Sequence, residues 1–151
     1  MSRSHKHLLV RLGLAVVLFA SGCSSLVTVD VTGGWAANMT WTSGPLAGFS
    51  QPFSLDLVQD EKDIAGTVTL VSHSTNTYTI DVTFGRASGS SVEFTASGVN
   101  DQISPEIPVT FDFDGEASDT EMSGTGTANI AGAAYNFTWT ATLVTPPPVE
   151  E

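Results

Sequence analysis

The stretch Tyr78-Thr79-Ile80-Asp81-Val82-Thr83-Phe84 alternates apolar and polar side chains without a break. A period of two is typical of a β-strand that buries one face and exposes the other to water. The apolar members of this stretch, from Tyr78 to Phe84, are therefore expected to point into a core. The polar members are expected to lie on the outer surface.

The same alternation recurs along the chain, and no apolar pattern of helical period follows residue 32. Turn residues separate the expected strands, which cover 35–42, 53–59, 64–71, 78–84, 91–97, 109–114, 121–130 and 135–144. Strands joined by mostly short connections predict an all-β fold, a single eight-stranded antiparallel up-and-down barrel, because closure removes exposed strand edges. A β-sandwich is the alternative, since strand count and alternation are the same in both. A transmembrane barrel is not expected, because that class turns its apolar face outward.

The N-terminal segment differs from the rest of the chain. Arg3 and Lys6 give it a basic start, an apolar run follows over 8–20, and small residues close it at Ala20-Ser21-Gly22. This order is the signature of a secretory signal peptide. The apolar run is shorter than the roughly 20 residues that a stable membrane-spanning helix needs. We therefore expect a helical signal peptide over 1–22.

The sequence Ser21-Gly22-Cys23 resembles the cleavage box of bacterial lipoproteins, with Ala20 where Leu is commonest. The resemblance implies cleavage after Gly22, a lipid on the sulfur of Cys23, and a further acyl chain, such as palmitate, on its amino group. Several acyl chains hold a protein stably on a bilayer, because each buried CH₂ contributes about 0.8 kcal/mol. Ser24 follows in place of Asp, which implies the outer membrane in a Gram-negative cell. The alternative is an ordinary signal peptide that leaves Cys23 as a free thiol.

These features divide the chain into four parts: a signal peptide over 1–22, a lipidated tether over 23–32, a β-domain over 33–144 and a Pro-rich acidic tail over 145–151. The whole chain has a formal charge of −11. Three of its five basic residues precede Cys23 and all sixteen acidic residues follow it, so processing makes the protein more acidic. Such a surface repels phosphate groups, and we expect no nucleic-acid partner.

Gly33-Gly34-Trp35, at the start of the first expected strand, resembles the Gly-x-Trp motif that opens lipocalins and, in a related form, avidin-like proteins. The resemblance implies a calycin-type barrel from Gly33 to Val144. It does not identify a ligand, because the chain has no Thr-Asp-Tyr element and no late arginine to stack on Trp35. A C-terminal helix is not expected either.

The expected barrel interior suggests a binding site for a hydrophobic small molecule, since eight-stranded barrels are either filled by side chains or hold one small ligand. Gly124 and Gly126 remove volume from one wall, which leaves either a pocket floor or room for an aromatic ring. A completely filled core is the alternative. The candidate lumen residues are Trp35, Met39, Trp41, Tyr78, Phe94, Phe111, Gly124, Gly126 and Trp139.

Metal binding and catalysis have weaker support in the sequence. A carboxylate cluster suits Ca²⁺ in principle, but its spacing is not that of an EF-hand and a solvated acidic turn is favoured. His73 lies in an expected turn, and no nucleophile elbow, zinc-binding helix or phosphate loop is present. We therefore expect no enzyme activity and no cofactor. The carboxylates in question are Asp112, Asp114, Glu116, Asp119 and Glu121.

Two functions remain from the sequence. The first is an envelope lipoprotein, attached to the lipid bilayer through acylated Cys23, whose barrel binds a hydrophobic small molecule. The second is a non-catalytic structural or protein-interaction module of the bacterial cell envelope.

Overall fold

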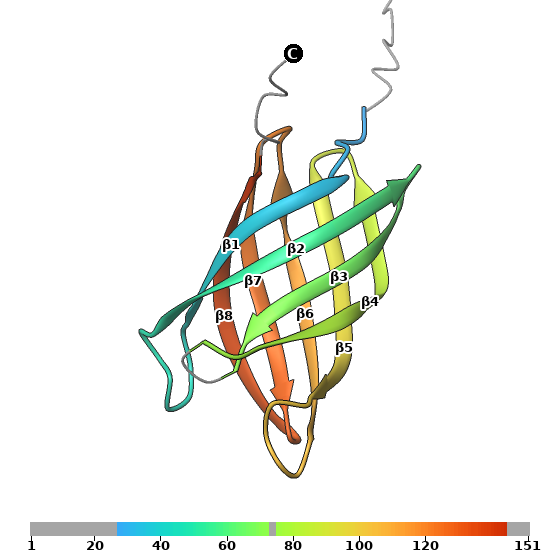
Figure 1. Ribbon diagram of the computed structural model, residues 1–151. Helices are drawn as coiled ribbons and strands as arrows, with labels where there is room; N and C mark the ends of the chain where they lie inside the picture. Colours follow the sequence, from blue (N-terminus) through green and yellow to red (C-terminus); the bar gives the residue numbers. More distant parts are fainter. Residues whose placement is uncertain (1–26, 73–74, 145–151) are drawn as a thin grey trace, which may run out of the picture.

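A computed structural model describes residues 27–72 and 75–144. Eight antiparallel strands follow one another in sequence order and close into a barrel (Figure 1). This confirms the all-β barrel prediction and rejects the sandwich. The predictions for the signal peptide, Cys23, His73 and the tail over 145–151 lie outside the described residues. The strands are β1 (Gly33–Trp41), β2 (Ser50–Asp60), β3 (Asp63–Val71), β4 (Thr77–Ser88), β5 (Ser91–Asn100), β6 (Ile107–Ala117), β7 (Glu121–Ile130) and β8 (Ala133–Leu143).

The barrel closes through the pairing of β1 with β8, in which Ala37 lies opposite Ala141. Most connections between sequential strands are short. Between β7 and β8, Ala131 and Gly132 have φ values of 53° and 84°. Positive φ at both central residues is what the tight hairpin turn that matches strand twist requires. Among the described residues, no helix has the length and apolar character needed to cross a membrane.

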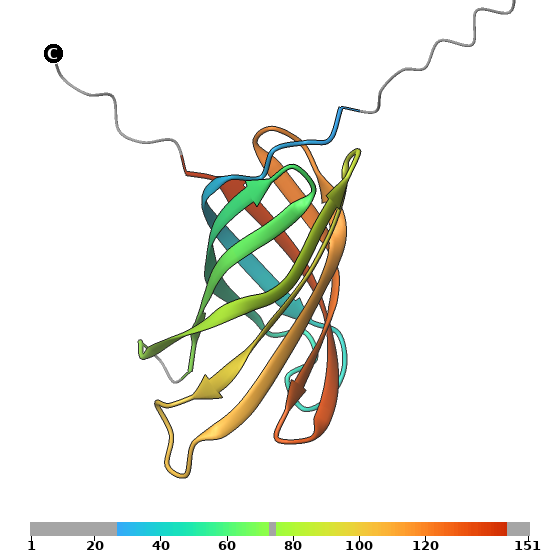
Figure 2. The ribbon, with the colours of Figure 1, turned by 90° about the vertical axis from the view of Figure 1, so that its right-hand side faces the viewer.

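The two ends of the barrel differ. The segment that precedes β1 and the end of β8 lie at the same end, which we call the terminal end (Figures 1 and 2). The β1–β2, β3–β4, β5–β6 and β7–β8 connections lie at the opposite end, which we call the open end (Figure 1).

The segment before β1 covers the terminal end. Val31 is fully buried, and its backbone N–H donates to Oε1 of Gln59 at 3.0 Å. The backbone N–H of Val29 donates to the carbonyl of Gly89 at 2.8 Å. The last residues of the expected tether therefore pack onto the barrel.

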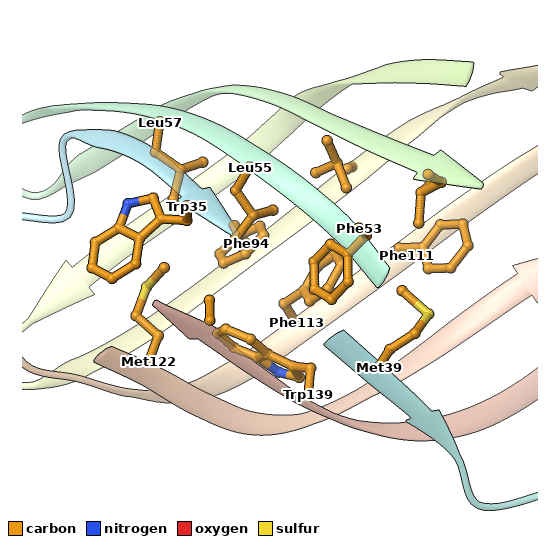
Figure 3. Close-up of a cluster of buried hydrophobic side chains, with 14 of the residues drawn as sticks. Trp35, Met39, Phe53, Leu55, Leu57, Phe94, Phe111, Phe113, Met122 and Trp139 are labelled. Atoms are coloured by element: carbon orange, nitrogen blue, oxygen red, sulfur yellow. The ribbon is translucent and has the colours of Figure 1, made fainter. Parts of the chain in front are cut away.

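The middle of the barrel is filled by aromatic side chains around Phe113 (Figure 3). Its ring centroid lies 4.6 Å from that of Phe94, 5.4 Å from that of Phe137 and 5.6 Å from that of Trp139. Such close-packed interiors leave little room for water or ligand. The middle of the barrel is therefore filled by side chains, and any cavity lies nearer one of its ends.

The expectation that Phe84 points inward is wrong. The register between β4 and β5 shifts between Val82 and Phe84, and the Phe84 side chain is 54% exposed. A β-bulge of this kind inserts one residue and reverses the alternation beyond it. Gly85 then faces inward, where an added Cβ would lie 2.5 Å from the carbonyl oxygen of Ile64. The interior has no room for a large side chain there, which explains the outward position of Phe84.

Candidate functional site

The nine residues predicted to line a lumen site are divided among the terminal end, the packed core and the open end. Trp35 lies near the terminal end, where its indole N–H donates to the carbonyl of Val31 at 2.9 Å. Trp139 packs in the aromatic cluster, and its indole N–H donates to the carbonyl of Thr125 at 3.0 Å. Met39 and Phe94 are buried in the same core. The remaining side chains, Trp41, Tyr78 and Phe111, line a cavity at the open end.

The two glycines of the predicted pocket wall face filled space. A Cβ added at Gly126 would lie 2.2 Å from Cζ of Phe137, and one at Gly124 would lie 1.9 Å from the carbonyl oxygen of Asp114. The volume that Gly126 leaves is therefore taken by the ring of Phe137 from the neighbouring strand. The glycines allow close packing of β6, β7 and β8.

Two adjoining cavities lie at the open end. One, of about 200 Å³, lies in the mouth of the barrel, and the other, of about 220 Å³, lies beside the β1–β2 loop. Trp41, Leu46 and Ile130 line both. The mouth cavity is otherwise lined by Gln51, Val71, Ser72, Tyr78, Asn100, Ile103, Ile107, Val109 and Phe111, and the loop cavity by Ser43, Pro45 and Tyr135.

The β1–β2 loop forms one wall of both cavities. Its tip carries Leu46, which is 47% exposed. The backbone N–H of Gly48 donates to the carbonyl of Trp41 at 2.7 Å, which ties the loop to the end of β1. Gly44 has a φ of 74°, and a Cβ there would lie 2.5 Å from the Tyr135 ring, so only glycine fits. The loop therefore holds an apolar side chain over the open end.

Trp41 is the aromatic residue between the two cavities. Its ring lies edge-on to those of Tyr135 and Phe137, at centroid distances of 6.3 Å and 5.7 Å. Its indole N–H is buried and has no hydrogen-bond acceptor among the described residues. The indoles of Trp35 and Trp139 both have one. A buried donor without an acceptor costs about 1–3 kcal/mol, so Trp41 is less well satisfied than the other two.

The linings of the two open-end cavities carry no charged side chain, that is no Asp, Glu, Lys, Arg or His, among the described residues. Burial raises the pKa of the Tyr78 hydroxyl to about 12, so this group stays protonated. An apolar cavity without a charged partner penalises an ionic ligand, because burying an unpaired charge is costly. The geometry suits an uncharged, largely apolar group.

The acidic residues of the suggested cation cluster belong to the outer face and its turns. Asp112 accepts a hydrogen bond from Oγ1 of Thr95 at 2.6 Å, and Glu116 accepts from the hydroxyls of Ser90 and Ser91. Within residues 27–72 and 75–144, no three His, Cys, Asp or Glu side chains are grouped so as to hold a metal ion. Of the others, Asp114 is on β6, Asp119 is in the β6–β7 turn and Glu121 begins β7.

A groove of about 550 Å³ on the outer face of β5 to β8 was not foreseen from the sequence. Outward side chains of neighbouring strands form its two sides, and Phe84 lies along it. Alternation alone shows that these residues face outward. Only the strand register shows which of them lie side by side, so this groove required the structure.

The fold defines the protein as a small closed eight-stranded antiparallel β-barrel, compatible with the lipocalin-like fold that Gly33-Gly34-Trp35 suggested. Comparison with protein-family models, with curated proteins and with solved structures gave no match.

Proposed function

We propose that this protein is a lipid-anchored, non-enzymatic protein of the bacterial cell envelope whose barrel binds a small, uncharged, hydrophobic molecule at its open end. The observation that carries the binding proposal is the pair of cavities that share Trp41, Leu46 and Ile130 and have, among the described residues, no charged side chain in their lining. Apolar pockets with a few polar groups are the usual form of small-molecule sites.

The size of the cavities limits the ligand. Each measures close to 200 Å³, below the roughly 300 Å³ at which pockets for drug-sized ligands begin. A dry apolar cavity of about 150 Å³ accepts benzene, so one ring or a short alkyl chain fits each space. The proposed ligand is therefore a small molecule, or the end of a longer one.

The proposed anchor agrees with the direction of the barrel. Ser21-Gly22-Cys23 supports lipidation of Cys23, and the segment that precedes β1 enters the barrel at the terminal end (Figure 2). A tether entering at that end leaves the open end free of the attachment point. In a Gram-negative cell we propose the outer membrane as the location, on the resemblance to lipoprotein signals.

Binding is tested with toluene as a neutral probe and benzoate as its charged counterpart. We expect toluene to shift the methyl NMR signals of Leu46 and Ile130, and benzoate to have little effect. Leu46→Glu should weaken toluene binding about tenfold, because it places a carboxylate in the cavity wall. Val58→Glu, at a position on the outer face of β2 with 58% exposure, is the matched control. Unchanged methyl signals at saturating toluene would contradict the proposal.

A second candidate function is a structural or protein-interaction module of the envelope. The filled aromatic core around Phe113 favours it, since a barrel without a deep lumen is a rigid unit. The toluene experiment separates the two functions, because a module of this kind needs no ligand at the open end.

A further inference from the structure

The groove on the outer face lies between two rows of side chains that cross the strands. The strand register defines both rows, because Asp112 lies opposite Thr127 and Asp114 lies opposite Thr125. Between the rows the lining also includes Gly126 and three residues that are buried in the core, Phe94, Phe113 and Phe137. One row consists of Thr42, Asn136, Thr127, Asp112, Thr95 and Phe84, and the other of Thr138, Thr125, Asp114 and Glu93.

Phe84 places an exposed aromatic ring at one end of the first row. The β-bulge before it turns the ring out of the barrel, and the protein gives up the stabilisation that its burial would provide. Bulges that redirect a side chain are frequent beside functional sites. A ring held in this way at a groove offers a flat apolar surface to a ligand.

The charge of the groove restricts its occupant. Glu93, Asp112 and Asp114 line it, and among the described residues no lysine or arginine does, although Arg86 on β4 lies opposite Glu93, next to the end of the second row. One oxygen of Asp112 accepts from Thr95, so this carboxylate is already fixed in position. The groove therefore repels anionic chains and favours ligands that are neutral or carry amino groups.

The closed barrel also argues against a peptide strand as the occupant. A peptide usually binds a sheet by adding to an exposed edge, and this barrel has none because β1 pairs with β8. The groove offers hydroxyl, amide and carboxylate groups from side chains instead. These groups suit a ligand that carries many hydroxyls of its own.

The spacing of side chains along each row fits a chain of sugars. Neighbouring strands lie about 4.8 Å apart, close to the repeat of about 5 Å in an extended β-1,4-linked saccharide. A saccharide lying across the strands would present about one ring to each strand. The apolar face of a sugar ring can stack on Phe84 while its hydroxyls bond to the two rows.

We propose that the groove across β5 to β8 binds an extended saccharide chain without acidic groups, with one sugar ring stacked on Phe84. The site is separate from the cavities at the open end, and it would function whether or not those cavities bind a ligand.

The experiment titrates the whole protein with three soluble probes and follows backbone NMR signals. The probes are a tetramer of N-acetylglucosamine, a tetramer of glucosamine and, as the acidic counterpart, a tetramer of galacturonate. We expect the first two to shift Thr95, Thr125 and Thr138 and the third to have no effect. Absence of binding by both non-acidic probes at millimolar concentration would overturn the proposal, as would equal binding of galacturonate or shifts confined to the open end.

Variants locate the site. Phe84→Ala should weaken binding about tenfold, because the stacking surface is lost. Val58→Ala, another exposed apolar position, should leave binding unchanged. Asp114→Asn should weaken the glucosamine tetramer more than its N-acetylated form, since it removes a negative charge. Unaltered affinity in Phe84→Ala would overturn the proposal, and saturating toluene should leave saccharide binding intact.

Discussion

The indole N–H of Trp35 donates to the backbone carbonyl of Val31 at 2.9 Å, and this bond fastens the segment before β1 to the first strand of the barrel. Val31 is fully buried, and its own N–H is bonded to Gln59 of β2. The entering chain is therefore part of the folded unit at the terminal end.

The Trp35 bond can be measured by comparing the same substitution at two tryptophans. Trp35→Phe removes a hydrogen bond, whereas Trp41→Phe removes an indole N–H that has no acceptor among the described residues. Both variants lose similar apolar volume. We expect Trp35→Phe to lower the free energy of unfolding by about 1 kcal/mol more than Trp41→Phe, the net value of one hydrogen bond. Urea unfolding measures both, and equal losses would contradict the assignment.

Phe113 should be the most sensitive position of the aromatic cluster. Its ring stacks on Phe94 and meets Phe137 and Trp139 edge-on. Phe113→Ala should therefore destabilise the protein by about 3–5 kcal/mol, as is usual for a buried Phe truncated to Ala. Phe84→Ala, at a ring that is half exposed, should change the free energy of unfolding by less than about 1 kcal/mol. Similar losses at the two sites would mean that the ring of Phe84 is buried.

Gly126 and Gly34 provide a matched pair for the packing of β7. A Cβ at Gly126 would meet Cζ of Phe137 at 2.2 Å, whereas a Cβ at Gly34 has no neighbour within 4 Å. Gly126→Ala should cost about 1–3 kcal/mol through overpacking. Gly34→Ala should be neutral or stabilise by up to about 1 kcal/mol, because alanine lowers the entropy of the unfolded chain. Thermal unfolding would show a lower Tm for the first variant only.

Tyr78 should make the barrel sensitive to alkaline pH. Burial raises the pKa of its hydroxyl from 10.0 to about 12 in the folded state. The stabilising effect of the neutral phenol is complete below pH 10 and is lost as the pH rises toward 12, where the folded state must also ionise. Urea unfolding across this pH range should show a decline that Tyr78→Phe reduces. An identical decline in Tyr78→Phe would assign the effect to another group.

Lipidation at Cys23 is tested by expressing the full chain in a bacterium that processes lipoproteins. Mass spectrometry of the membrane fraction should find a chain that begins at Cys23 and carries acyl groups. Cys23→Ala should lose the modification and leave the membrane fraction. Ser24→Asp is the control, and it should stay lipidated and membrane-bound. An unmodified Cys23, or full membrane retention of Cys23→Ala, would contradict the anchor.

The strands were predictable because their alternation is regular, and closure followed from their number and their short connections. The direction of Phe84 was not predictable, because nothing within Tyr78–Phe84 shows that a bulge follows Val82. That bulge accommodates the packing of Gly85 against Ile64, on the neighbouring strand β3. The alternation of side chains can be read from one strand alone, whereas a β-bulge depends on how two neighbouring strands pair.

The candidate site was predictable only in part for a similar reason. Trp41, Tyr78 and Phe111 were named from their inward faces, and they do meet at the open end. Leu46 was missed because it lies in a loop, where no periodicity gives it a direction. The sequence showed that Gly126 leaves space in the barrel wall. Which side chain fills that space, Phe137, depends on the register between β7 and β8. Lipidation of Cys23 stays a prediction from the sequence.

An even number of strands in simple succession brings Val27 and Val144 to the same end of the barrel, where β1 and β8 are already paired. Every strand is therefore hydrogen-bonded on both sides, and the pairing of the strands does not depend on where the chain begins. A circular permutant that links these ends and opens the chain in the β5–β6 connection would keep every strand pairing. It would also move both new termini to the opposite end, so the direction in which the barrel points from an attachment is separable from its fold.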